Sequence, residues 1–568
     1  MNAAHSNRAW IHRIAREPNA IWMREMRQSA RLERTPWVLF AITLTTALLM
    51  CSIGGLASAS KSTPASVGSI LFQVFFSIGY LVVTLIGPAV AANSIASERE
   101  GKTWEAVLLT GLSPKQVARG KFMAAYTTIA LYIVVLAPVG ALSFLFGGVT
   151  ATDVVLAFVF LFVLAGLTVA FGLAVSSLMQ SLRSAIVVTL VLAIIIGPTL
   201  YFTFGSGASF GIHALFPEVP EGEPIWFPLA ISRATFGAAY VTFLVFLPTL
   251  ILLIPAWFLY EATVSNLAGG ADDRSTGLKR WFAICTPLLV AACAAPGLVA
   301  TDDGGRRTLG MFGIACLALH LGFCALLFAF EPPGPSRRVR IHWQRDNAGV
   351  VTRFFGPGLL KTAYLVTGMG VTGLLVAAIA PIAAMYIWGS GPSRDRYVEQ
   401  ILVFALYETG FFVFVVGLTT WLRSRGNTPW ITRLIASAIM FLVCAGPWIV
   451  AAIGGVLLRA EGWFIAAPSP FFVFSILAKL EESPGTSDTL STRNLGGACA
   501  IGWALVGLLL LVLAARRCAR VIAQEDAAAA LADESLQAED DASRALVTSA
   551  GDPTPGDAHG ALHAGEGG

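Results

Sequence analysis

Charged residues are scarce in this chain: they make up 13% of its 568 residues, while hydrophobic residues make up 56%. The mean hydropathy is +0.72. A typical soluble domain is about 25% charged, so this composition excludes an ordinary soluble protein and predicts a polytopic membrane protein. The net charge of +4 is too small to indicate nucleic acid, and no nucleic-acid partner is expected.

The signatures of catalysis and of metal binding are also missing. No metal-ligand spacing occurs, and most of the eight cysteines lie inside apolar segments, which predicts buried thiols rather than disulfides. A phosphate-binding loop requires G-x-x-x-x-G-K-[ST]. Gly101-Lys102-Thr103 supplies its end, but Ala96 stands at the first glycine position. We therefore expect no enzyme activity and no cofactor in this chain.

The N-terminal segment does not resemble a cleavable signal peptide, because a long arginine-rich arm precedes the first apolar run. Within it, Ile21, Trp22, Met26 and Ala30 line one side of a predicted helix. This pattern is typical of a helix at an anionic cytoplasmic leaflet, and a solvated basic tail is the alternative. The arginines are Arg8, Arg13, Arg16, Arg24, Arg27, Arg31 and Arg34.

Long apolar runs are what the chain has in abundance. A span needs about 20 apolar residues, and the sequence predicts twelve spans in two sets of six. The first set covers 37–57, 68–93, 122–147, 153–177, 184–204 and 237–261. The second covers 281–300, 309–330, 362–388, 398–422, 431–456 and 497–516.

Lysine and arginine alternate with these spans as the positive-inside rule requires. Basic residues gather in every second loop, which predicts that both termini are cytoplasmic. Two long loops on the other side, 205–236 and 457–496, are rich in proline and aromatic residues, which predicts ordered turns or short re-entrant helices. The fold class is therefore an all-α, polytopic transmembrane bundle.

A polar stretch, 97–121, separates the second and third spans. Ser97 and Glu100 match a capping box, which predicts a helix beginning there, with an apolar stripe of Trp104, Val107, Leu108 and Leu112. Ser113-Pro114-Lys115-Gln116 predicts the start of the next helix. An amphipathic helix in this place either rests on lipid or docks a soluble partner.

The run Glu98–Ser113 resembles the E-R-E-x-G-T-(L/W)-E-x-L-L-x-T-P-L-S run of ABC-2 type ABC-transporter permeases. It departs at Gly101-Lys102, where the family more often has a charged residue and then glycine, and at Gly111, where proline is usual. The resemblance implies an N-terminal elbow helix and a cytoplasmic coupling helix, 98–112, that sits on a separate ATPase subunit. The implied coupling residues are Glu98, Arg99, Glu100, Thr103, Trp104, Glu105, Val107, Leu108 and Leu112.

In this reading Trp104, Val107 and Leu108 form the apolar contact, with Glu98, Glu100 and Glu105 as its polar rim. ATP and magnesium belong to the partner ATPase. The chain would be the permease of an ATP-driven exporter in the bacterial cytoplasmic membrane, as a homodimer or as a pseudo-dimer within one chain. Alternatives are an ion-driven secondary transporter and a scaffold or enzyme acting on lipid-linked substrates.

The predicted organisation has four parts. Residues 1–36 form the arm with the elbow helix, 37–268 the six-span permease half, and 269–520 a second half that is a candidate degenerate repeat. Residues 521–568 form a disordered tail, in which the stretch near Ala523–Leu536 is a candidate extension of the last helix. The repeat signal is the pair Gly172-Leu173 and Gly417-Leu418, but loop 331–361 shows no counterpart of Glu98–Ser113.

Two ionisable residues fall within spans. Glu408 and His320 lie near the middle of theirs, and charge in a membrane is costly and often functional. They mark a candidate intramembrane polar site, or each only fixes helix packing through a hydrogen bond.

Overall fold

The computed structural model describes residues 19–31, 34–59, 63–216, 218, 227–270, 272–389, 391–458, 463–483 and 485–550. Within these ranges the secondary structure is entirely helical. Twelve helices are long and apolar enough to cross a membrane, so the prediction of an all-α, multi-pass protein is confirmed.

The spans of the first set coincide with the predicted ones, and several helices extend beyond the predicted limits at one end or both. They are Pro36–Ala59 in α3, Pro64–Glu100 in α4–α5, Pro114–Leu145 (α7), Ala151–Leu178 (α8), Leu182–His213 in α9–α10 and Ala238–Leu267 in α12–α13. Those of the second set are Thr276–Val299 (α14), Asp303–Phe330 from α15, Leu359–Trp388 (α18), Arg394–Ser424 (α19), Pro429–Gly454 in α20 and Ser487–Arg544 in α22.

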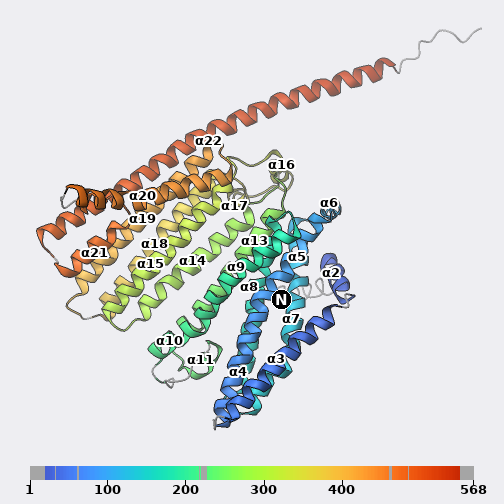
Figure 1. Cartoon of the computed structure of the whole chain (residues 1–568). Coiled ribbons are helices and arrows are strands. Elements are labelled where there is room, and N and C mark those ends of the chain that lie inside the picture. The colour runs from blue at the N-terminus through green and yellow to red at the C-terminus, as the bar shows by residue number, and fades with distance from the viewer. Residues whose placement is uncertain are drawn as a thin grey trace, which may run out of the picture.

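Short helices between the spans distinguish the two ends of the bundle. One end carries α2 (Ala20–Ala30), α6 (Trp104–Leu109), α16 (Arg337–Arg345) and α17 (Val350–Phe355); we call it the α6 end (Figure 1). The opposite end carries α10 (Ser206–Leu215), α11 (Phe227–Arg233) and α21 (Phe472–Glu482). Each long loop predicted on that side therefore holds short helices.

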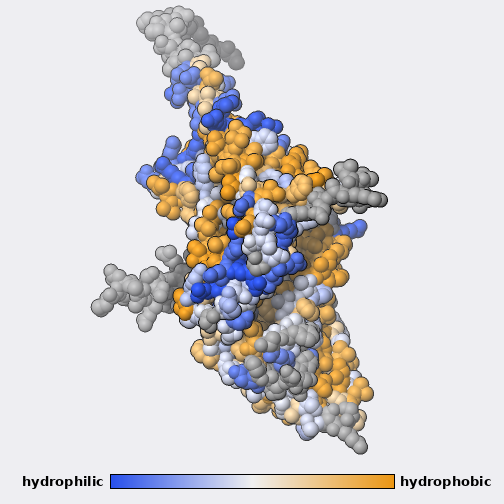
Figure 2. Space-filling view, turned by 90° about the vertical axis from the view of Figure 1, so that its left-hand side faces the viewer, coloured by the Kyte–Doolittle hydropathy of each residue, from blue (hydrophilic) through white to orange (hydrophobic). Residues whose placement is uncertain are grey.

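Buried apolar side chains form two clusters. One draws on residues from Ile21 to Leu267 and the other on residues from Leu250 to Leu511. Helix α13 (Leu247–Leu267) supplies both, since Leu252 belongs to the first and Leu250 to the second. The side of the bundle seen in Figure 2 shows hydrophilic surface among larger hydrophobic areas, as expected where ordered polar loops meet lipid-facing spans.

The glycines that suggested an internal repeat meet different partners. A Cβ on Gly172 of α8 would lie 2.2 Å from the Pro88 carbonyl oxygen of α5 (Gly87–Glu100). A Cβ on Gly417 of α19 would lie 2.3 Å from the Gly507 carbonyl oxygen of α22. Both glycines permit close helix packing, but one faces the second span of its set and the other the sixth.

Two proline-containing spans include a π-helical turn. Val82–Ile86 precedes Pro88, and Val241–Phe246 precedes Pro248, with the same two-residue spacing. Proline cannot donate a backbone hydrogen bond and clashes with the carbonyl four residues earlier, and the wider turn accommodates it. The irregularities before Pro88 and Pro248 thus take the form of π-helical turns.

The prediction of a disordered tail from residue 521 is wrong as far as Ala550, and the candidate helical extension near Ala523–Leu536 is only part of the helix that forms. Helix α22 runs unbroken from Ser487 to Ala550. Residues 521–550 contain no glycine or proline and are rich in alanine, which is the strongest helix former. Residues 551–568 lie outside the described part of the chain.

Candidate functional site

The 97–113 segment is organised differently from the sequence-based expectation. Ser97 does not begin a helix: it lies near the end of α5, and its hydroxyl donates to the Asn93 carbonyl oxygen at 2.5 Å. The helix resumes only over Trp104–Leu109. The capping-box pattern failed here because a span already in progress supplied the hydrogen bonds that an N-cap would satisfy. The second signal is confirmed: Ser113 and Gln116 form a capping box at the start of α7.

Both departures from the family run fall at unusual backbone positions. Lys102 has φ 55° and Gly111 has φ 73°. Proline, whose φ is fixed near −65°, could not occupy position 111 in this conformation. The family order, with glycine second, would place glycine at the left-handed position that Lys102 takes here.

Glu98 lies inward rather than on a rim. Its Oε2 lies 3.0 Å from Nζ of Lys121, a side chain with no exposed surface. Lys121 also contacts Glu25 Oε1 at 3.2 Å and donates to the Ser94 carbonyl oxygen at 2.8 Å. Arg24 of α2 pairs with both Glu25 and Glu98. This ion-pair network joins α2, α5 and α7 directly beside α6.

Arg24 shows the electrostatic balance of the network. Burial lowers the pKa of its guanidinium, but hydrogen bonds to Glu25 and Glu98 and their charges outweigh that effect, so the pKa is raised above its ordinary value. Arg24 is therefore always charged, and α2 is fixed to the end of the second span. Its N-cap Asn19 also donates to the Gln116 carbonyl oxygen of α7 at 2.8 Å.

Arg99 and Glu100, which follow Glu98 at the end of α5, connect this helix to α8 and α9. Arg99 Nη1 donates to the carbonyl oxygens of Ser177 and Met179, at 2.8 and 3.1 Å, where α8 ends. Its guanidinium also lies 5.7 Å from the Trp104 ring centroid. Glu100 Oε2 accepts from the Leu182 amide at the start of α9 at 2.7 Å, which suits an acidic group at a helix N-terminus. The segment that leads into α6 therefore contacts both α8 and α9.

The surface that α6 offers differs from the predicted apolar contact. Val107 is only 6% exposed and belongs to the core of its own chain. Trp104 and Leu112 are half-buried against that core. The side chain of Leu108 lies outside the described residues. Thr103 and Glu105 are exposed.

Leu109 is the residue that sequence reasoning missed, with 87% of its surface exposed. Helical periodicity could not find it, because a six-residue helix has too few turns to define a buried face. With Glu105 and Ala106 it forms the outer surface of α6. We call these three residues the α6 tip.

We expect Val107→Asp to destabilise the folded protein rather than only to change a surface contact of α6. A carboxylate would replace a buried valine with no partner, at a cost of about 3 kcal/mol or more in unfolding free energy. Ala106→Asp is the matched control, because Ala106 is exposed on the same helix, and it should change stability by about 0.5 kcal/mol at most. Denaturation in mild detergent distinguishes them; equal midpoints would contradict the burial of Val107.

The second set of spans has its own buried pair at the α6 end. Lys279 of α14 and Glu331 are 1% and 0% exposed, with Nζ and Oε1 3.4 Å apart. Lys279 also donates to the Gly356 carbonyl oxygen at 2.7 Å, and Glu331 Oε2 accepts from the Gly358 amide at 3.0 Å. This pair fixes the loop that carries α16 and α17. That loop lacks the Glu98–Ser113 motif, yet it holds two short helices in the corresponding place.

A cavity of about 690 Å³ opens beside the Lys121 network. Glu25, Gln28, Asn93 and Lys121 contribute polar groups, and the remainder of the lining is mixed. Its walls come from α2, α3, α5, α7 and α9. The cavity therefore reaches from the ion pairs at the α6 end into the span region, a juxtaposition that no local sequence pattern indicates.

Glu408 and His320 do not form one site. His320 lies among aromatic rings, 5.8 Å from Trp281 by ring centroids, and contacts Cys324 through sulfur at 3.6 Å. It lines a second cavity, of about 550 Å³, whose walls are almost entirely apolar. Glu408 lies instead near Cys444 of α20. The two residues therefore have separate surroundings.

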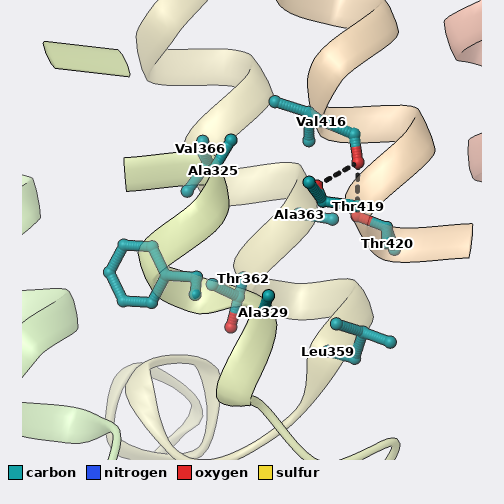
Figure 3. Close-up of a pocket in the computed structure, with 10 residues that line it drawn as sticks. Ala325, Ala329, Leu359, Thr362, Ala363, Val366, Val416, Thr419 and Thr420 are labelled. Carbon is teal, nitrogen blue, oxygen red and sulfur yellow. Dashed lines mark hydrogen bonds between the residues drawn. The ribbon is translucent and has the colours of Figure 1, made fainter. Parts of the chain in front are cut away.

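A third cavity, between α15, α18 and α19, is too small for a substrate (Figure 3). Its volume of about 20 Å³ suits roughly one water molecule. The hydroxyls of Thr362, Thr419 and Thr420 on its walls already donate to backbone carbonyl oxygens. Among the described residues, no group of three or more His, Cys, Asp or Glu side chains is placed to hold a metal ion.

A scan against protein-family models found no match for this chain, and a search of curated proteins found none either.

Proposed function

We propose that the chain is the membrane permease of an ATP-driven transporter, with ATP hydrolysis on a separate subunit. One observation carries this proposal: α6 presents an exposed leucine at its tip while Glu98, Arg99 and Glu100 join its base to α2, α7, α8 and α9. A force applied to the tip would reach α5 and these four helices through ion pairs and hydrogen bonds. That arrangement suits a docking site for a soluble partner subunit.

The orientation in this proposal comes from the charge pattern. The α6 end carries the loops with the most lysine and arginine, so it faces the cytoplasm under the positive-inside rule. ATP binding would close the partner subunits, and the energy of that closure would bias the bundle between two arrangements. The π-helical turns in the second and sixth spans supply positions where the helices are already irregular.

The test is to purify the intact protein in mild detergent from its own host and identify what accompanies it. We expect an ATP-hydrolysing subunit, and ATP-dependent transport after both are placed in vesicles. Transport driven by a proton gradient without ATP would instead support an ion-driven secondary transporter. Glu408, an acidic residue within a span, is the observation that favours that second candidate.

A further inference from the structure

The loop that holds α16 and α17 exposes a surface unlike that of α6. Residues 331–358 contain five arginines and only two carboxylates. Arg337, Arg338, Arg345 and Arg353 are exposed. Four large apolar side chains are exposed beside them: Ile341 at 53%, Val350 at 85%, Val351 at 71% and Phe354 at 39%. We call residues 337–354 the basic surface.

The basic surface is held at the level where the spans end. Val339, on the inner side of α16, is buried. Thr276, at the start of α14, donates to the Phe355 carbonyl oxygen at 3.2 Å, and the Leu359 amide at the start of α18 donates to the Pro332 carbonyl oxygen at 2.8 Å. Arginines with exposed aliphatic and aromatic side chains at this level match a segment that lies in the headgroup region of a bilayer.

The chain itself offers an anionic partner for these arginines. Residues 521–550 of α22 carry seven carboxylates and one arginine. As this helix leaves the bundle (Figure 1), Asp533 pairs with Arg337 at 2.5 Å, and Asp526 pairs with Arg340. We call residues 521–550 the acidic helix.

The ion pairs between the two are weak enough to exchange. All four side chains are between 36% and 56% exposed, and ion pairs this exposed contribute little stability. Anionic headgroups attract each arginine near a membrane surface at least as strongly. Phospholipid headgroups and the acidic helix therefore attract the same two arginine side chains with similar strength.

We propose that the basic surface binds anionic phospholipid of the leaflet at the α6 end, and that the acidic helix competes with the headgroups for Arg337 and Arg340. This inference does not depend on the proposed transport function, since it concerns a different loop and needs no ATP. Under this competition, the position of α22 depends on the phospholipid composition of the membrane.

The experiment uses the full chain in phosphatidylcholine nanodiscs with increasing phosphatidylglycerol. A bimane label is placed by Val351→Cys in a Cys51→Ser background, since Cys51 is the exposed cysteine and the other seven are buried or half-buried. We expect the emission to shift to the blue as phosphatidylglycerol rises. The double variant Asp526→Asn with Asp533→Asn should lower the phosphatidylglycerol fraction at the midpoint of this shift about threefold or more, because two arginines are freed. Arg345→Gln with Arg353→Gln should raise it by a similar factor.

Matched controls change the same charge elsewhere. Asp540→Asn with Asp541→Asn alters the acidic helix away from Arg337 and Arg340, and Lys115→Gln with Arg119→Gln removes two exposed positive charges near α6. Both should leave the midpoint unchanged. Equal midpoints for Asp526/Asp533 and Asp540/Asp541 variants would overturn the competition. Emission that ignores phosphatidylglycerol but shifts when a soluble partner subunit is added would overturn the lipid assignment.

Discussion

Glu331→Gln should lower the unfolding free energy by about 3–5 kcal/mol, because it leaves Lys279 as a buried charge without its counterion. Both side chains are almost fully buried, at 0% and 1% exposure. The glutamine can still accept from the Gly358 amide, as Glu331 does at 3.0 Å, so the substitution removes charge while preserving shape. The loss should appear as an earlier midpoint in denaturation of the purified protein in mild detergent.

Glu399→Gln is the matched control for this prediction. Glu399 pairs with Arg493, but its side chain is 34% exposed and that of Arg493 is 36% exposed. An exposed pair is worth about 0–1 kcal/mol, so this change should barely move the midpoint. Lys279→Met combined with Glu331→Gln should recover most of the loss, since neither charge remains. Equal losses in Glu331→Gln and Glu399→Gln would show that the buried pair does not hold the loop.

The spans could be predicted because the membrane imposes one simple requirement. Every backbone polar group in lipid must be satisfied within its own helix, so a long apolar run is a span almost regardless of context. Local capping chemistry was equally readable where no competing structure existed, as at Ser113, whose capping box with Gln116 is formed. These inferences rest on residues near one another in the sequence.

The site could be predicted only in part, because its contacts join distant segments. Glu98 and Glu100 look like rim residues on a helical wheel, yet one lies beside Lys121 and the other caps α9. The pairing of Lys279 with Glu331 crosses 52 positions, and neither residue has a local signal. The tail prediction failed for another reason: few large apolar side chains to bury argued for disorder, while the alanine-rich sequence favours a single helix.

Under the proposed function, Leu109→Asp should weaken binding of the partner ATPase by about tenfold or more while leaving the protein folded. Leu109 is 87% exposed, so its replacement removes no internal contact, and the denaturation midpoint should match that of the parent. Burying a leucine at an interface is worth about 1.5–3 kcal/mol, and a carboxylate in its place adds a desolvation cost. Because 1.4 kcal/mol is tenfold in affinity, co-purification of the ATPase should fall about tenfold or more.

The control for this change is Leu531→Asp. Leu531 is 67% exposed on α22, between Asp526 and Asp533, which pair with α16. It introduces the same charge at the same end of the molecule but away from the α6 tip, so ATPase binding should persist. Full retention of the ATPase by Leu109→Asp would show that the α6 tip is not the ATPase-binding site. In that case the rigid base built by Glu98, Arg99 and Glu100 would only brace the spans, and the energy for transport would have to enter elsewhere.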